Sequence, residues 1–177
     1  MNYESRLFFE GFTALEEALM EEALSEAALA AEQGEVPAGA ILADPEGRPL
    51  GRGRNQVLTL ADPTAHAEIM AIRAAAAKAG NYRLTGHILV STLEPCPMCL
   101  MAAIHARVGL VIFGAPEPRW GAAGSLVDLA GLAGLNHHPL VRGGLLAEAA
   151  RNLITSFFLA RRKTPSYFDK PTEFIRK

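Results

Sequence analysis

Two short stretches of the chain hold side chains of the types that can bind a metal ion. The two cysteines of the chain, Cys96 and Cys99, are separated by two residues in TLEPCPMC, and the upstream stretch DPTAHAEIM carries His66 and Glu68. One imidazole and two thiolates are zinc ligands, and three protein ligands leave the fourth tetrahedral position to a water. Zinc lowers the pKa of such a water to about 7, which gives a nucleophile at neutral pH. Glu68, two residues from the histidine, is placed to move protons without binding the metal.

Each of these features alone has a simpler explanation. A C-x-x-C pair is also typical of redox proteins, a histidine near a helix start is usually solvated, and a glutamate in a first turn usually complements the helix dipole. The combination of H-x-E with a later P-C-x-x-C is far more specific, because it is the signature of zinc deaminases that act on nucleobases. We therefore predict one Zn²⁺ per chain, with His66, Cys96 and Cys99 as ligands and Glu68 as the catalytic proton carrier.

The segments around these stretches alternate between helical and extended patterns. Thr13 and Glu16 fit a capping box, followed by an alanine-rich stripe that ends at Gly34, and further helices are predicted over 65–79, 97–105, 126–132 and 145–163. Strands are predicted over 38–44, 48–57, 87–92, 108–115 and 137–142. Such alternation predicts an α/β domain with helices on both faces of one sheet. Cys96 and Cys99 open a helix three residues apart, so both sulfurs reach one ion and the helix N-terminus favours their thiolates.

Composition and charge narrow the class of protein. The chain has 177 residues, half of them hydrophobic, and a formal net charge of −2. Two cysteines cannot form a disulfide framework, and the sequence shows neither a signal peptide nor an apolar run that could cross a membrane. We expect a cytoplasmic protein with an extension over 1–12, a catalytic domain over 13–163 and an irregular tail over 164–177. Acidic residues dominate the first 35 positions, and basic residues dominate the segment from Arg151 to Lys177. A near-neutral net charge can therefore hide a basic face.

The order of several motifs resembles one family. DPTAHAEIMA, NYRL, TLEPCPMC, IHARV, FGA, WGAAGSLVDL and LNHHP are similar to segments of the bacterial tRNA-specific adenosine deaminases, in the cytidine-deaminase-like superfamily. The resemblance implies a three-layer α/β/α fold around a five-stranded mixed sheet. It also implies a zinc hydrolase that converts adenosine to inosine at the wobble position of a tRNA anticodon. Family members are homodimers, and their partner is the anticodon stem-loop.

The resemblance also implies substrate-binding residues. Asn55 matches an asparagine that hydrogen-bonds the target base, and the loop 117–120 matches a segment that contacts RNA near the flipped nucleotide. The residues implied in total are Asn55, Glu117, Arg119, Phe157, Phe158, Arg161 and Arg162. The loop departs from the family pattern D-x-K, because it reads Glu117-Pro118-Arg119. Trp120 replaces a small residue, and an exposed aromatic beside a single strand can stack on a base.

Three other functions fit parts of the sequence. A free nucleobase deaminase, for guanine or cytosine, would use the same zinc site, which does not distinguish between substrates. A non-catalytic RNA-binding protein with structural zinc would not need Glu68. A redox protein would need only the cysteine pair.

Overall fold

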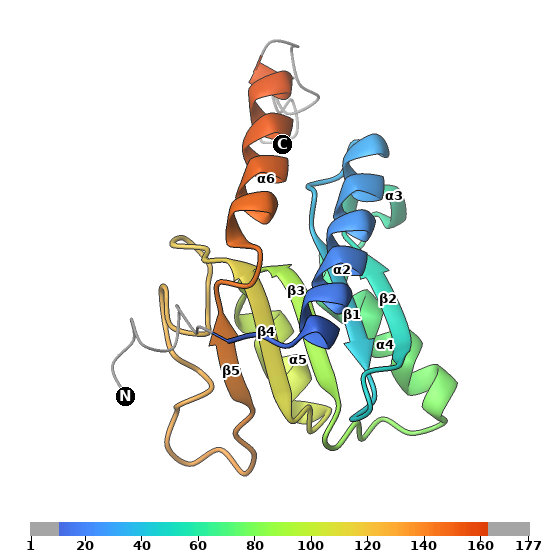
Figure 1. Cartoon of the computed structure of the whole chain (residues 1–177), viewed down its shortest axis with the longest axis vertical. Helices are drawn as coiled ribbons and strands as arrows, with labels where there is room; N and C mark the ends of the chain where they lie inside the picture. Colours follow the sequence, from blue (N-terminus) through green and yellow to red (C-terminus); the bar gives the residue numbers. More distant parts are fainter. Residues whose placement is uncertain (1–10, 163–177) are drawn as a thin grey trace, which may run out of the picture.

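Five strands form one mixed sheet in the computed structural model, which describes residues 11–162 (Figure 1). Their order is β2-β1-β3-β4-β5, with β1 antiparallel to β2 and β3, and with β4 parallel to β3 and β5. The strands are β1 (Gly39–Ala43), β2 (Pro49–Arg54), β3 (Ile88–Leu93), β4 (Leu110–Ala115) and β5 (Leu140–Gly143). The prediction of a five-stranded mixed sheet is therefore confirmed.

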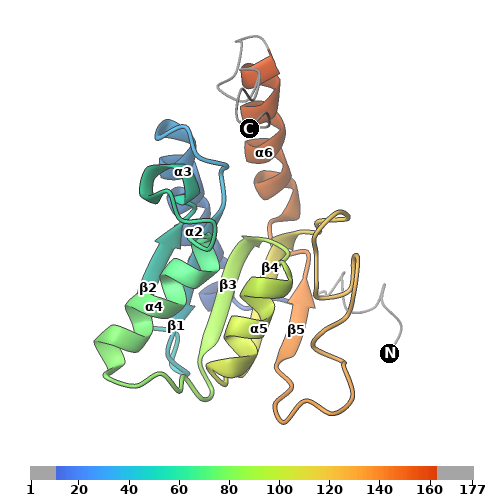
Figure 2. The same ribbon diagram turned by 180° about the vertical axis from the view of Figure 1, so that it is seen from behind.

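Helices cover both faces of this sheet. Figure 1 shows α2 (Ala14–Glu32) and α6 (Ala147–Arg162) on the near face, and Figure 2 shows α4 (Ala67–Ala79) and α5 (Pro97–His105) on the opposite one. The short α3 (Val57–Leu60) follows β2, and α6 projects beyond the sheet in both views. The three-layer α/β/α architecture is confirmed.

The sheet divides the core into two halves because successive strand residues point to opposite faces. On β1, Ala40 and Leu42 pack with the alanines of α4 and α5, whereas Ile41 and Ala43 pack with Leu19 and other residues of α2. The capping box expected at the start of α2 is present, with Thr13 Oγ1 accepting from the Glu16 amide at 3.2 Å. Aliphatic packing on both faces thus holds the helices in fixed positions over the sheet.

Small residues let α4 lie very close to β2. A Cβ atom added to Gly53 would lie 2.1 Å from the carbonyl oxygen of Ala67, and one added to Gly51 would lie 2.1 Å from that of Ala71. These distances are far below van der Waals contact, so glycine is required at both positions. The close approach fixes the first turn of α4, and therefore the residues that open it.

The segment between β4 and β5 differs from the prediction. A helix over 126–132 was predicted, but the structure has turns there, with an isolated bridge between Ala123 and Asp128. The Asp128 carboxylate accepts a hydrogen bond from the Gly131 amide at 2.9 Å, and the Leu129 amide donates to Ala122 at 2.9 Å. The backbone is thus bonded across the loop instead of along a helix, so the helix prediction is wrong.

Several expectations fall at the edges of the described range. Most of the extension over 1–12, together with Lys163 and the tail over 164–177, lies outside the described residues, so the domain limits stay predictions. Within residues 11–162, no helix combines the length and the apolar character needed to cross a bilayer.

The contact between Gly53 and α4 gives a testable expectation. Gly53→Ala places a methyl group against the backbone of α4, and overpacking of this kind lowers the free energy of unfolding by about 1–3 kcal/mol. Arg52→Ala is a matched control, since Arg52 is exposed on the same strand and forms an ion pair with Glu22. An exposed pair of this kind contributes roughly 0–1 kcal/mol. Urea unfolding compares the two variants, and wild-type stability of Gly53→Ala would contradict the packing argument.

Candidate metal centre and substrate cavity

Two helix N-termini meet at one edge of the sheet. His66 is the N-cap of α4 and Cys96 is the N-cap of α5, both with extended backbone, and Pro97 occupies the first turn of α5. Neither N-cap side chain makes a capping hydrogen bond to its helix. The imidazole and the thiol are therefore directed toward each other, with Cys99 one turn further along α5.

The three predicted ligands come together. The Sγ atoms of Cys96 and Cys99 each lie 3.6 Å from Nδ1 of His66, and the three ligand atoms lie within 4.8 Å of one another. Two sulfurs and one imidazole nitrogen in this arrangement form a donor set that fits zinc. Cys99 is fully buried, whereas Cys96 and His66 are partly accessible from the cavity described below.

The ionisation of the site reflects this crowding. The pKa of Cys96 is lowered to about 4, chiefly because its sulfur accepts a hydrogen bond from the Cys99 thiol. The same hydrogen bond, together with burial, raises the pKa of Cys99, and the hydrogen bond to Cys96 raises the pKa of His66. Burial raises the pKa of Glu68 to about 6. Zinc binding would release the thiol protons, since the metal binds thiolates.

A tight turn orients His66. The carboxylate of Asp62 accepts hydrogen bonds from the backbone amide of Thr64 at 2.8 Å and from its hydroxyl at 2.7 Å. These bonds lower the pKa of Asp62. The amide of His66 then donates to the Thr64 carbonyl at 2.8 Å. The sequence DPTAH is thus a turn that delivers the histidine to the start of α4.

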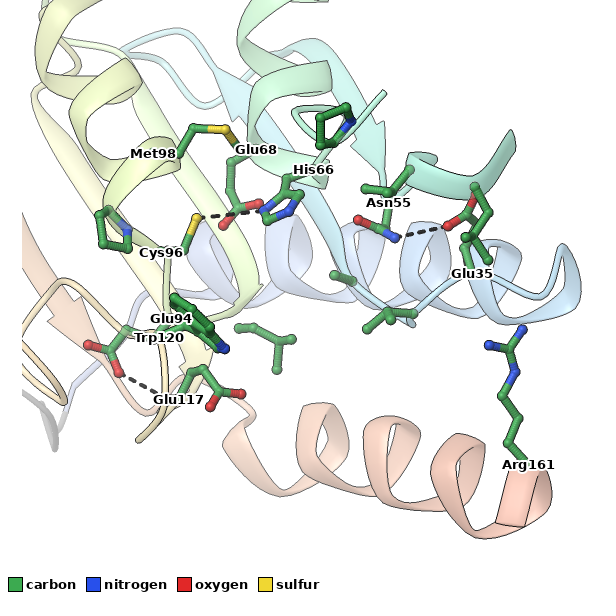
Figure 3. A pocket seen from close by; sticks show the side chains of 17 residues that line it. Glu35, Asn55, His66, Glu68, Glu94, Cys96, Met98, Glu117, Trp120 and Arg161 are labelled. Atoms are coloured by element: carbon green, nitrogen blue, oxygen red, sulfur yellow. Dashed lines mark hydrogen bonds between the residues drawn. The ribbon is translucent and has the colours of Figure 1, made fainter. Parts of the chain in front are cut away.

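The metal-binding group opens into a cavity of about 750 Å³ (Figure 3). Its lining includes most of the predicted site residues and several apolar side chains: Glu35, Val36, Ala38, Asn55, Val57, Leu58, Pro63, His66, Glu68, Leu93, Glu94, Cys96, Pro97, Met98, Glu117, Trp120 and Arg161. Figure 3 shows Glu68 beside His66 and Cys96, with Asn55 on the other side of the histidine. The structure therefore places Glu68, Asn55 and two of the three predicted ligands, His66 and Cys96, around one space, while Cys99 lies buried behind them.

The predicted RNA contacts on α6 are only partly brought to this cavity. Arg161 lines it, whereas Phe157, Phe158, Arg162 and the loop residue Arg119 do not. The Arg161 guanidinium stacks on Phe157 at 4.6 Å and donates to the carbonyl of Gly34. Phe158 packs edge-on against Phe157 and is 45% exposed. Arg161 thus reaches the cavity, while Phe157 and Phe158 pack beside it on α6.

Two buried glutamates in the cavity wall were missed from the sequence. Glu94 accepts hydrogen bonds from the amides of Glu117, Ala123 and Ser125 at 2.9–3.1 Å, and so anchors the loop that carries Trp120. Glu35 accepts from the Asn55 side chain at 3.0 Å. The available signal was an acid next to a strand-forming segment, in EVPAGAILA for Glu35 and in STLEP for Glu94. An acid that is buried with such a segment requires hydrogen-bond donors around its carboxylate.

Several named proteins are similar to this chain in sequence. The family of the cytidine and deoxycytidylate deaminase zinc-binding region matches residues 13–115. A tRNA-specific adenosine deaminase of Haemophilus influenzae is 40% identical over 148 residues, which are 84% of this chain and 86% of that protein. A tRNA(Ile)-lysidine synthase of Deinococcus deserti is 48% identical over 145 residues, but this chain spans only 27% of its length.

Solved structures agree with the sequence matches. A structure from a study of A-to-I editing by tRNA:A34 deaminases superposes with a TM-score of 0.74 and 41% identity, covering 77% of this chain and 98% of that one. Residues 13–115, which match the family model, include the H-x-E and P-C-x-x-C stretches that form the metal-binding group. The chain therefore belongs to the family of zinc-binding cytidine and deoxycytidylate deaminases, within its branch of tRNA-specific adenosine deaminases.

Proposed function

We propose that this chain hydrolyses adenosine to inosine at the wobble position of a tRNA anticodon. The observation that carries the proposal is that the metal-binding group, Glu68 and Asn55 face one open cavity. Relatives named for adenosine deamination in tRNA cover most of the chain, and the lysidine synthase relative is also named for tRNA. The names of these two relatives support tRNA as the substrate.

His66, Cys96 and Cys99 would hold the zinc, which supplies a water that is deprotonated near neutral pH. Glu68 is buried beside these ligands, and burial raises its pKa to about 6. A carboxylate with such a pKa can both accept and return a proton. We assign to Glu68 the transfer of a proton from the water to N1 of adenine, and then of a proton to the departing amine.

The cavity walls would hold the base. Asn55 supplies a polar contact, while Val57, Leu93 and Met98 give apolar surface on which a flat base can lie. Base-modifying enzymes receive the target nucleotide extruded from its stack into such a pocket. Trp120 is 66% exposed at the rim, where it is available to stack on a neighbouring base.

The size of the cavity favours a polynucleotide over a free base. A lone base needs a small closed pocket, whereas this cavity of about 750 Å³ is bordered by Leu58, Trp120 and Arg161 at its mouth. Incubation of the zinc-loaded protein with an anticodon stem-loop, and separately with free guanine and cytosine, tests the choice. Inosine at the wobble position supports the proposal, whereas turnover of a free base with no reaction of the stem-loop would replace it with the free-base alternative.

We also propose that the chain acts as a homodimer in the cytoplasm. Part of the small-residue surface of α4 and α5 packs on the chain's own sheet, through Ala71, Ala75 and Ala103. The outer side of the same helices carries Ala74 and Ala102, which lie outside that core and would allow a close symmetric contact. Sedimentation at micromolar concentration is expected to show a dimer, and a fully active monomer would contradict this assembly.

Substitution of Glu68 tests the role of the proton carrier. Glu68→Gln keeps the shape of the side chain, so zinc content should remain at one ion per chain while turnover of the stem-loop falls by about 10²–10⁴-fold. Cys96→Ala is the contrasting variant, because it removes a ligand and should lose zinc and activity together. Elemental analysis and single-turnover kinetics provide both readouts. Near wild-type turnover by Glu68→Gln would show that the proton is carried by another group.

The basic end of α6 gives a separate test of RNA binding. Arg161→Ala/Arg162→Ala should weaken stem-loop binding and leave zinc content unchanged, since a guanidinium stays protonated and has no lone pair to offer a metal ion. If both side chains contact phosphates, the slope of log K against log salt becomes shallower by about 0.7 per lost contact. Asn55→Ala should instead reduce turnover and retain the wild-type salt slope. An unchanged slope in the arginine variant would exclude the phosphate contacts.

A further inference from the structure

A buried carboxylate lies directly behind the residue that we assign to base binding. Glu35 follows α2, is 1% exposed, and has its amide bonded to the carbonyl of Ala30 at 2.9 Å. Its Oε2 accepts a hydrogen bond from Nδ2 of Asn55 at 3.0 Å (Figure 3). Asn55 is also mostly buried, and its backbone amide donates to Ala38 at 3.0 Å. Both partners are therefore fixed at the backbone as well as at the side chain.

This contact determines which way the Asn55 amide faces. A carboxylate only accepts hydrogen bonds, whereas an asparagine amide has one donor side and one acceptor side. The nitrogen of Asn55 must therefore point to Glu35, and a flipped amide would bring two acceptor oxygens together. Figure 3 shows the amide oxygen turned toward His66. The substrate would thus always meet the same amide atoms in the same orientation.

The second oxygen of Glu35 holds the neighbouring wall. Oε1 accepts a hydrogen bond from the backbone amide of Thr59 at 2.7 Å. Thr59 belongs to α3, whose residues Val57 and Leu58 line the cavity. One carboxylate thereby positions both the polar contact and the apolar surface on this side of the cavity.

We propose that Glu35 is a positioning residue for deamination, which acts by locking the amide orientation of Asn55. The proposal rests on the proposed function, because it gives Asn55 the contact to the target base. Glu35 itself does not touch the substrate in this account. A purely structural role, in which Glu35 only secures the end of α2 and α3, would affect activity by a route independent of Asn55.

Glu35→Gln separates the two roles. Glutamine keeps the shape but offers one acceptor oxygen in place of two, so it cannot accept from both Asn55 and Thr59. We expect kcat/KM on the stem-loop to fall by roughly 10- to 100-fold, as for small misplacements of a positioning group. Most of this loss should disappear when Glu35→Gln is added to Asn55→Ala, because the group that Glu35 orients is then absent and only the contribution of the Thr59 contact remains. Losses that multiply in the double variant would overturn the proposal.

Glu94→Gln is the matched control for this cycle. Glu94 is also a buried carboxylate of the cavity wall, but its hydrogen bonds go to the loop 117–125 and not to Asn55. Its loss should therefore multiply with that of Asn55→Ala. If the Glu94 variant also showed no further loss, the missing additivity would be a general property of damaged sites, and the result for Glu35 would not support positioning.

Nuclear magnetic resonance tests the contact without activity. In the wild-type protein, the proton of Asn55 Nδ2 that faces Glu35 should exchange slowly with solvent, and in Glu35→Gln the Asn55 side-chain resonances should shift. Fast exchange of both Asn55 amide protons in the wild-type protein would overturn the inference even if the variant does not fold. If the wild-type protein fails to deaminate the stem-loop while these protons remain protected, the contact stands, but the proposed function and the catalytic part of the inference both fail.

Discussion

The structure depends on one geometric constraint. A histidine at the start of α4 and two cysteines at the start of α5 must bring their ligand atoms within 4.8 Å of one another. The chain meets it by placing the N-termini of α4 and α5 side by side at one edge of the sheet. Gly51 and Gly53 allow α4 to lie against β2, and the Asp62 turn fixes the approach of His66. The alanine-rich composition of α4 follows from the same need, because larger side chains would separate this helix from the sheet.

Three buried glutamates around the cavity differ in what surrounds their carboxyl groups. The Glu94 carboxylate accepts hydrogen bonds from backbone amides and so holds a loop. The Glu35 carboxylate accepts one hydrogen bond from the Asn55 side chain and one from a backbone amide of α3. Glu68 lies beside the metal ligands, and burial raises its pKa to about 6. In the functions proposed here, the same residue type serves as an anchor, an orienting group or a proton carrier according to the groups around its carboxylate.

Local patterns in the sequence predicted the parts of the protein that depend on neighbouring residues. The capping box of α2 and five strands are present as predicted, since their signals lie within a few residues, and the structure brings His66, Cys96 and Cys99 together as the motif pair predicted. The contacts of Glu35 and Arg161 were not predictable in this way, because they join distant parts of the chain. Arg161 and its partner Gly34 are 127 residues apart, and Glu35 and its partner Asn55 are 20 residues apart. The segment 126–132 has a helical composition but bonds across its own loop, so tertiary contacts override its local preference.

The most direct test of this account is X-ray absorption at the zinc edge of the purified protein. The account predicts two sulfur ligands at about 2.3 Å and one imidazole nitrogen, with a light atom completing a four-coordinate site. The same measurement on Glu68→Gln should show an unchanged ligand set. Four sulfur ligands, no stoichiometric zinc, or coordination by Glu68 would contradict the assignment of these three residues as the zinc ligands and of Glu68 as the proton carrier.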